Sequence, residues 1–182
     1  MNKRRIAGLV LAGATGVSTV VGPVAAAQAA DPVGLIGSAF TIENKGSHKC
    51  LDARQSTLPG PVYQWACHST DPNQNWLLEA VATQPGWFSL RNLNSNLCLD
   101  LRAGVNSPVG NGTATQQWDC FPDSIGTERW QLNVAAGVPG YLTILSQSGK
   151  CLDLDSGSTA DGAKVQVWDC RGNVDNQLWR QG

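Results

Sequence analysis

The sequence predicts an all-β domain in which three equivalent units close into one pseudo-threefold structure. Three landmarks recur three times in the same order, namely a Cys-Leu-Asp triplet, a Trp-x-Cys triplet and a closing tryptophan, and the first of them recurs at spacings of 48 and 53 residues. The intervening segments are short apolar or alternating runs separated by Gly, Asn, Ser and Pro turns, without useful helical periodicity. Units this small cannot bury their apolar faces alone, so we expect them to share one core.

The landmarks divide most of the chain into three repeats, which we number one to three and place at residues 38–80, 86–133 and 140–182. Each repeat offers four strand-like segments: an opening run, the Cys-Leu-Asp segment, the Trp-x-Cys segment and the segment at the closing tryptophan. The prediction is therefore about twelve short strands. The closing tryptophans are Trp76, Trp130 and Trp179.

The first 29 residues have the pattern of a secretory signal peptide. Basic residues at positions 3 to 5 precede an apolar run that ends in the small-x-small sequence Ala27-Gln28-Ala29, which predicts cleavage before Ala30. A transmembrane anchor fits less well, because glycines, hydroxyl residues and a proline interrupt the run and no stop-transfer charges follow it. The pattern predicts a secreted, extracellular protein in which residues 30–37 form an N-terminal lead.

Without the predicted leader, the chain has ten Lys and Arg residues and 14 Asp and Glu residues, which gives a formal charge of −4. Such a mildly acidic chain lacks the basic patch that nucleic acid or an anionic membrane would require, so we expect neither as a partner. The remaining chain of roughly 150 residues has the size of one domain. We expect a monomer.

Six cysteines in an exported chain most simply form three disulfides, although six cysteines allow 15 pairings in principle. Each repeat holds two cysteines, and each bond within a repeat would close a loop of about 20 residues, worth about 3 kcal/mol in the chain-entropy model. The predicted pairs are Cys50 with Cys67, Cys98 with Cys120, and Cys151 with Cys170.

A zinc site is the alternative use of the first cysteine pair, because His48 and His68 flank Cys50 and Cys67 in a Cys2His2 set. Neither histidine recurs in the other repeats. The residues at these positions are Asn96 and Gly149 for the first, and Phe121 and Arg171 for the second. We therefore favour the disulfide and expect neither a metal nor another cofactor.

Repeat three contains the candidate binding residues in their most complete form. Residues i and i+2 of a strand share a face, so Asp153 is expected at the surface beside Cys151 while Leu152 points into the core. Gln166 and Trp168 share a face in the same way, and the predicted disulfide brings their strand back towards Asp153. The pattern predicts a shallow pocket with a carboxylate on one side and an indole on the other.

Such a pocket suits a pyranose ring. The apolar face of the sugar can lie on an indole, while adjacent hydroxyls donate to one ionised carboxylate. The amides of Asn176 and Gln177 can both donate and accept, as hydroxyls do. The closing tryptophans are expected in the core, whereas the residues alone leave the tryptophans before the second cysteines undecided between platform and core. The alternative role of Asp52, Asp100 and Asp153 is to cap turns.

The repeated Cys-Leu-Asp, Trp-x-Cys and Gln-x-Trp landmarks resemble those of the ricin B-chain-type lectins, and the resemblance covers about residues 38–182. It implies a carbohydrate-binding β-trefoil. In that family each sugar site uses the Asp after the first cysteine, an aromatic residue before the second cysteine, and Asn or Gln near the closing motif. Carried over to repeat three, the resemblance implies the best site, at Asp153, Gln166, Trp168, Asn176 and Gln177.

The other repeats depart from this pattern. Repeat one has Tyr63 where repeat three has Gln166, and is expected to bind through Asp52, Trp65, Asn73 and Gln74. Repeat two ends in Glu128-Arg129-Trp130, with Thr127 in place of the amide. Its site is expected to be lost or altered in specificity, and would use Asp100, Gln116 and Trp118.

The resemblance implies a lectin without enzymatic activity, which binds galactose-type or related sugars of polysaccharides or glycoproteins and gains from multivalent attachment. A glycosidase is a weaker alternative: Asp155, Asp169 and Asp175 lie near Asp153 in sequence, but three shallow pockets offer no deep cleft. A non-lectin β-trefoil, such as a protease inhibitor, is the other alternative, because the long loop at residues 105–113 of repeat two could serve as a binding loop.

Overall fold

The computed structural model describes residues 35–54, 58–104 and 107–182, so the predicted signal peptide and most of the N-terminal lead lie outside the described residues. The described residues form fourteen strands and four short 3-10 turns, and contain no α-helix. No helix among them is long and apolar enough to cross a membrane. The prediction of an all-β protein is confirmed.

The strands are grouped by the repeat in which each begins. Repeat one contains β1 (Ala39–Phe40), β2 (Ile42–Asn44), β3 (Lys49–Asp52), β4 (Gly60–Pro61), β5 (Tyr63–Ala66) and β6 (Trp76–Ala80). Repeat two contains β7 (Phe88–Asn92), β8 (Cys98–Leu101), β9 (Thr113–Trp118) and β10 (Trp130–Val134). Repeat three contains β11 (Leu142–Ser146), β12 (Lys150–Leu154), β13 (Val165–Asp169) and β14 (Trp179–Gln181). The count exceeds twelve because the opening run of repeat one splits at Thr41 and its hairpin loop forms the extra strand β4.

The 3-10 turns lie next to strands, and two of them, η2 and η5, themselves carry candidate site residues. They are η2 (Pro72–Gln74), η3 (Gly126–Glu128), η4 (Asp155–Gly157) and η5 (Asp175–Gln177). Three of them, η2, η3 and η5, immediately precede the closing tryptophan of their repeat. They therefore place the residues of the Gln-x-Trp motif, or its variant, beside the Cys-Leu-Asp strand.

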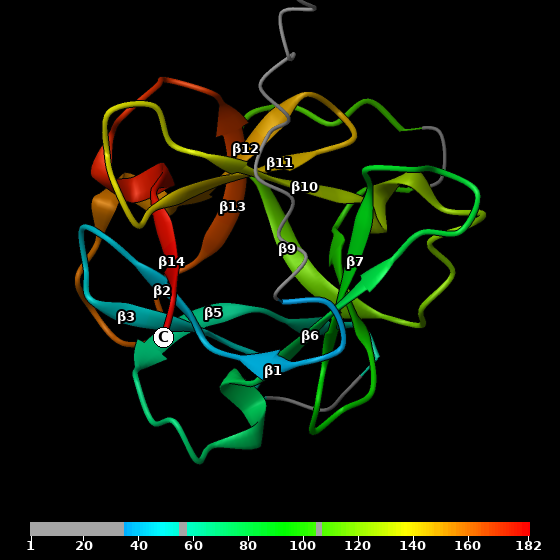
Figure 1. Ribbon diagram of the computed structural model, residues 1–182, viewed down its shortest axis with the longest axis horizontal. Coiled ribbons are helices and arrows are strands. Elements are labelled where there is room, and N and C mark those ends of the chain that lie inside the picture. The colour runs from blue at the N-terminus through cyan, green and yellow to red at the C-terminus, as the bar shows by residue number, and fades with distance from the viewer. Residues whose placement is uncertain (1–34, 55–57, 105–106) are drawn as a thin grey trace, which may run out of the picture.

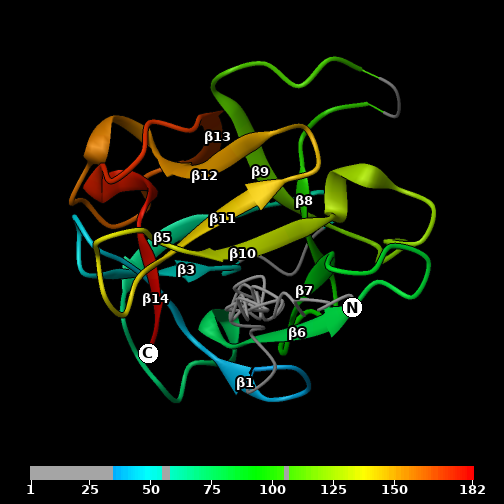
Figure 2. The same ribbon diagram turned by 45° about the horizontal axis from the view of Figure 1, so that its top comes forward.

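The sheet closes on itself. Antiparallel pairing runs from β7 through β8, β9, β13, β12, β11 and β10 and returns from β10 to β7. A second branch leaves β11 through β14 to β2, β3 and β5. Figure 1 shows the three repeats as three groups of strands around a common centre, and Figure 2 shows β10, β11, β12 and β13 as successive strands of the closed part.

Hairpin loops connect the repeats in a cycle. Gly60 of repeat one pairs with Gln117 of repeat two. The amide of Gly112 in repeat two donates to the Val167 carbonyl of repeat three at 2.9 Å, and that of Gly162 in repeat three donates to the Gln64 carbonyl of repeat one at 2.9 Å. The acceptors occupy the same position of each repeat, directly before the tryptophan of Trp-x-Cys. Each repeat therefore completes the edge of another.

The closing tryptophans form the centre of the shared core, as predicted. All three side chains are 0% exposed. Each indole Nε1 donates to the carbonyl of the leucine in its own Cys-Leu-Asp triplet, at 3.0 to 3.1 Å, so the polar edge of the ring is satisfied in the interior. The acceptors are Leu51, Leu99 and Leu152.

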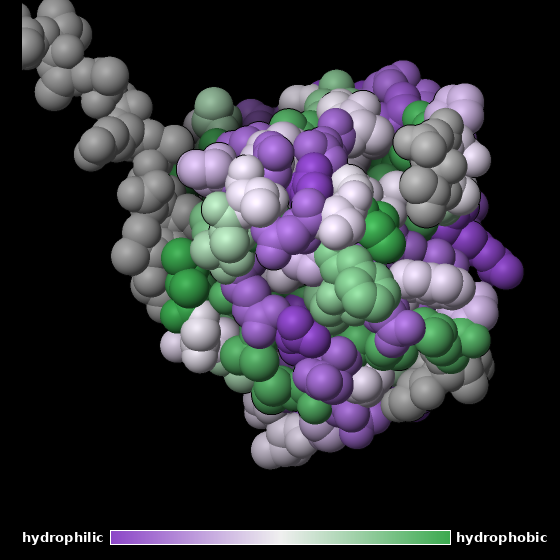
Figure 3. Space-filling model, turned by 90° about the vertical axis from the view of Figure 1, so that its right-hand side faces the viewer, coloured by the Kyte–Doolittle hydropathy of each residue, from purple (hydrophilic) through white to green (hydrophobic). Residues whose placement is uncertain are grey.

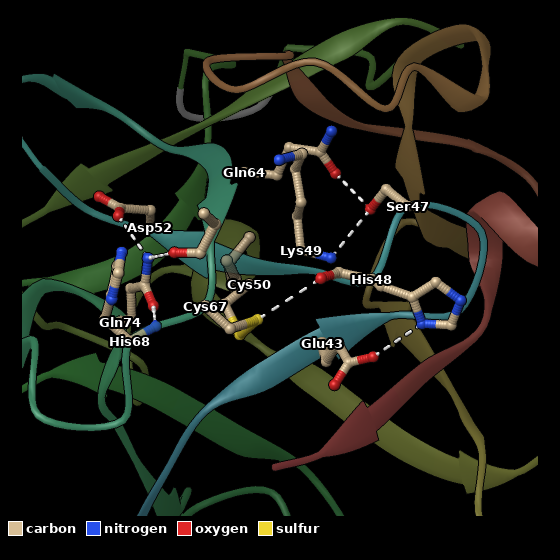
Figure 4. The surroundings of a disulfide bond; sticks show 12 residues. Glu43, Ser47, His48, Lys49, Cys50, Asp52, Gln64, Cys67, His68 and Gln74 are labelled. Atoms are coloured by element: carbon tan, nitrogen blue, oxygen red, sulfur yellow. Dashed lines mark hydrogen bonds and ion pairs between the residues drawn. A yellow bond between two sulfur atoms is a disulfide. The ribbon is translucent and has the colours of Figure 1, made fainter.

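The three predicted disulfides are present, with Cα–Cα distances of 5.0 to 5.1 Å. The zinc alternative required two thiolates, whereas the sulfurs of Cys50 and Cys67 are bonded to each other. His48 instead occupies a turn with a φ of 54°, a left-handed conformation that Asn96 and Gly149 adopt in the other repeats. Figure 4 shows its ring directed towards Glu43, with 3.1 Å between Nδ1 and Oε1.

Candidate functional site

Asp153, the predicted centre of the site in repeat three, lies on β12 opposite Gln166 of β13. The prediction that its side chain is presented at the surface is wrong, because Asp153 is only 1% exposed. The strand alternation gives the face on which a side chain lies, but not what covers that face. Here polar side chains from β13, η5 and the segment after the second cysteine fold over the carboxylate.

Four side chains donate to Asp153. Its Oδ2 accepts hydrogen bonds from Asn176 Nδ2 at 2.8 Å, Gln177 Nε2 at 2.9 Å and Arg171 Nη2 at 3.0 Å. Its Oδ1 accepts from Gln166 Nε2 at 3.2 Å. The structure thus brings together all the predicted polar residues of repeat three. Donors on both oxygens stabilise the carboxylate in place despite its burial.

Trp168 differs from the closing tryptophans because it is only partly buried. It lies opposite Cys151 in the β12–β13 pair, two residues along the strand from Gln166. The Cα of Gly112 approaches so closely that a Cβ there would lie 3.8 Å from both the Trp168 ring and Gln166 Oε1. The loop of repeat two therefore supports one side of a partly exposed indole that stands beside the Asp153 cluster.

Repeat one also has a buried aspartate that accepts a hydrogen bond from a glutamine, but a different arginine lies over it. Asp52 is 1% exposed, and its Oδ2 accepts from Gln74 Nε2 at 2.9 Å (Figure 4). The Arg54 guanidinium lies 4.2 Å from the centroid of the Trp65 ring and 3.4 Å from Asp52 Oδ2. Arg54 therefore covers the indole that was predicted as a sugar platform and at the same time reaches the carboxylate.

Asn73 is not brought to this centre in the way that Asn176 is in repeat three. Its Nδ2 donates to Asp71 Oδ1 at 2.7 Å, and its Oδ1 accepts from Asn94 Nδ2 at 2.8 Å. The cause is Asp71, which caps η2 and takes both the backbone and the side-chain amide of Asn73. Repeat three has no such cap, since Val174 stands at that position.

Repeat two has an open pocket of about 320 Å³ at its predicted site. The carboxylate of Asp100, the indole of Trp118 and the side chain of Thr127 all line it. Gln116 Nε2 donates to Asp100 Oδ2 at 2.7 Å, whereas the buried Asp100 Oδ1 has no hydrogen-bond partner among the described residues. The side of the molecule formed around β7 and β10 has hydrophilic and hydrophobic residues interspersed (Figure 3).

Two arginines at these centres were not predicted. Arg54 lies two residues beyond Asp52, just after the end of β3, so its closeness to Asp52 in the sequence was a signal that it could reach the carboxylate. Arg171 comes from the segment after the second cysteine of repeat three, where no strand periodicity indicates its direction. Both are partly exposed, with side chains 44% and 49% accessible, and each contacts a buried aspartate.

The carboxylates considered for a glycosidase form ion pairs with lysines. Asp155 lies 3.3 Å from Lys164, Asp169 lies 2.6 Å from Lys150, and Asp175 lies 2.5 Å from Lys45. The hydrogen bond from Lys150 lowers the pKa of Asp169 below its usual value. These contacts tie all three carboxyl groups to lysines. Asp155 also accepts a hydrogen bond from Gln166 Nε2 at 3.4 Å, so it lies beside the Asp153 cluster.

The chain is similar to several known proteins. It is 27% identical over 124 residues to polypeptide N-acetylgalactosaminyltransferase 4 of Caenorhabditis elegans, an alignment that covers 66% of this chain but only 17% of that enzyme. The crystal structure of the designed threefold-symmetric protein ThreeFoil matches with a TM-score of 0.67 and 29% identity, over 79% of this chain and 96% of that one. An exo-β-1,3-galactanase from Clostridium thermocellum matches with a TM-score of 0.69 and 25% identity, over 80% of this chain and 30% of that one.

Two family descriptions match along the chain. Residues 33–118 match a ricin-type beta-trefoil lectin domain-like family, and residues 86–182, more than half of the chain, match the ricin-type beta-trefoil lectin domain itself. The matches together cover all three disulfide-closed repeats and their aspartate-centred clusters. On this ground the chain belongs to the ricin-type beta-trefoil lectin domain family.

Proposed function

We propose that the protein is a secreted lectin without enzymatic activity, with up to three shallow sites for galactose-type or related sugars of polysaccharides or glycoproteins. The observation that carries the proposal is the cluster around Asp153, in which a buried carboxylate held by three amides stands beside a partly exposed indole. Because repeat three alone keeps all five implied residues, we propose it as the best site. The three disulfides agree with an oxidising, extracellular location.

Arg171 defines how a sugar would enter repeat three. Its side chain is half exposed and ends on Asp153 Oδ2, whereas Gln166 and Gln177 are buried and fixed. Displacement of the guanidinium would open an acceptor position on Asp153 Oδ2 for a sugar hydroxyl, while Asn176 and Gln177 keep the carboxylate oriented. The apolar face of the ring would then lie on Trp168.

The same exchange applies to repeat one, where Arg54 covers both Asp52 and Trp65. Repeat two differs in that a pocket of about 320 Å³ lies against Asp100 and Trp118. Weak single sites on three repeats would gain avidity on a surface that presents many copies of one sugar.

Trp168→Ala is expected to weaken sugar binding at repeat three by roughly tenfold or more, since loss of the stacked indole removes about 1–2 kcal/mol. The unfolding temperature should fall by only a few degrees, because the ring is partly rather than fully buried. A glycan array on the mature protein selects the sugar, and titration calorimetry with its monovalent methyl glycoside then gives affinity and stoichiometry.

Trp87→Ala is the matched control, because Trp87 is also partly buried but lies in the β6–β7 turn, outside all three sites. It should bind like the unmodified protein. If folded Trp168→Ala bound sugar with unchanged affinity and stoichiometry, the site in repeat three would be assigned wrongly. A protein that bound no glycan at all would contradict the lectin proposal as a whole.

A further inference from the structure

Repeat two has a carboxyl group where the other repeats have an amide. Glu128 occupies the place of Gln74 and Gln177, and all three side chains are 0% exposed. One oxygen of each accepts a backbone N–H from the segment after the second cysteine. The donors are His68 for Gln74 at 2.7 Å, Arg171 for Gln177 at 2.9 Å, and Phe121 for Glu128 at 2.7 Å. The three side chains are therefore held in the same orientation.

The other end of each amide positions the aspartate of the site. Gln74 Nε2 donates to Asp52 Oδ2, and Gln177 Nε2 to Asp153 Oδ2, both at 2.9 Å. The same nitrogens donate to the carbonyls of Ala66 and Asp169 at 2.9 and 3.0 Å. In repeats one and three, this amide is thus a donor that faces acceptors only.

An ionised Glu128 cannot fill this role, because both of its oxygens are acceptors. Its Oε1, at the position of the donating nitrogen, is buried without a partner in the described part of the chain. Asp100 Oδ1 is also unpartnered there, as is Asp52 Oδ1 of repeat one, so Glu128 Oε1 is the atom that distinguishes repeat two. Two unpartnered carboxyl oxygens in one buried cluster would carry a large desolvation cost if both groups were charged. A proton on one of the two carboxyl groups removes this conflict.

We propose that Glu128 is protonated in the native site and that its O–H replaces the amide N–H, donating towards Asp100. Glu128 is then a positioning residue: it orients the carboxylate that lines the pocket of repeat two and contacts no sugar itself. The sugar-binding part of this inference rests on the proposed lectin function, whereas the proton itself does not.

The charged surroundings favour the neutral acid. Asp100 on β8 and Asp119 after β9 both disfavour a second negative charge, and Arg91 on β7 opposes them more weakly than burial does. Burial is the largest cause and, against the hydrogen bond from Phe121, raises the pKa of Glu128 to about 7. Burial also raises the pKa of Asp100, whose ionised form Gln116 and Thr127 support by hydrogen bonds. The two carboxyl groups therefore share one proton near neutral pH.

The pH dependence of folding has a defined sign. An unfolded Glu has a pKa of about 4.3, whereas the folded value is about 7. Between these values the native state binds more protons than the unfolded state, so the stabilising contribution of this proton is fully present below about pH 4.3 and is lost as pH rises through about 7. The amides of repeats one and three do not titrate and contribute no such slope.

Thermal unfolding of the full mature chain and of its Glu128→Gln variant between pH 5 and 8, in buffer with a chelator, tests the proposal. The variant carries a permanent donor, so its unfolding temperature should equal that of the unmodified protein at pH 5 and exceed it by on the order of 5 °C at pH 8. The two proteins differ only at residue 128, so the difference between their unfolding temperatures isolates its contribution. A difference that stays constant across this range overturns the proposal.

Gln177→Glu supplies the reverse test, because it places the same carboxyl group beside Asp153. This variant should acquire the pH-dependent loss of stability that Glu128→Gln loses. If it is equally stable relative to the unmodified protein at pH 5 and pH 8, a buried glutamate at this position does not take up a proton, and the proposal fails.

Sugar binding gives a separate readout. In a Trp65→Ala, Trp168→Ala background that leaves only repeat two, the selected methyl glycoside should bind about tenfold more weakly at pH 8 than at pH 5, as the protonated fraction falls. Glu128→Gln in this background should remove the difference. Absence of any sugar binding by the unmodified protein would contradict the lectin proposal, while the unfolding curves would still decide the protonation of Glu128.

Discussion

Replacing Trp179 with alanine is expected to lower the free energy of unfolding by about 3–5 kcal/mol, which is a large share of the 5–15 kcal/mol typical of a domain. The side chain is 0% exposed in the core that the three repeats share, so its loss leaves a cavity in that core. It also leaves the buried carbonyl of Leu152 without the indole N–H that donates to it at 3.0 Å. Urea unfolding followed by circular dichroism measures the change.

Trp168→Ala is the natural comparison, because it also removes an indole from repeat three, in this case the one of the Trp-x-Cys triplet. It should cost about 1–2 kcal/mol, since the indole is only partly buried against Gly112. The contrast between the two variants tests the division of the tryptophans into core and platform. Equal losses of stability would mean that Trp168 is a core residue and would remove the platform from the proposed site.

The features that the sequence predicted correctly depend on repetition. Landmarks that recur three times predicted the strands, the pairing of each cysteine within its repeat and the burial of the closing tryptophans, because every repeat supplied an independent instance of one pattern. The cycle of hairpin loops could not be predicted in this way. The loops around Gly60, Gly112 and Gly162 differ in length and sequence, and their pairing depends on how one repeat is placed against another.

The sequence predicted which residues of repeat three lie together, but not how exposed they are. Strand alternation placed Asp153 and Gln166 on one face, yet it carried no information about Arg171, which folds over that face from an irregular segment. Asn73 was assigned by analogy with Asn176, but the capping residue Asp71 takes its amide. In both cases a residue outside the repeated pattern determines which side chains contact the aspartate. Such a residue occurs once, so repetition within the sequence cannot reveal its role.

Glu128 illustrates a different limit. The departure from glutamine was visible in the sequence and predicted a lost or altered site, because only the missing amide could be counted. The structure adds that the position is fully buried and that it keeps its hydrogen bond from Phe121. On these two facts we expect that the carboxyl group of Glu128 can still donate to Asp100, but only while it is protonated.

Asp153→Ala is expected to abolish sugar binding by repeat three and also to lower the free energy of unfolding by about 3–5 kcal/mol. The carboxylate accepts hydrogen bonds from four side chains, and two of the donors, Gln166 and Gln177, are themselves buried. Without it, their amides lose an acceptor in a place that water reaches poorly. Calorimetric titration with the selected methyl glycoside, and urea unfolding of the same samples, measure the two effects.

Asp175→Ala is the matched control, since Asp175 lies on η5 in the same repeat but is 57% exposed and makes a surface ion pair with Lys45. Its loss should change stability by less than about 1 kcal/mol and leave sugar binding intact. If Asp153→Ala were no more destabilising than this control, the cluster would be held together without its carboxylate. If Asp153→Ala lost stability as expected but bound sugar with the stoichiometry of the unmodified protein, Asp153 would have a structural role only. The side chains that donate to it would then be the ones that bind the sugar.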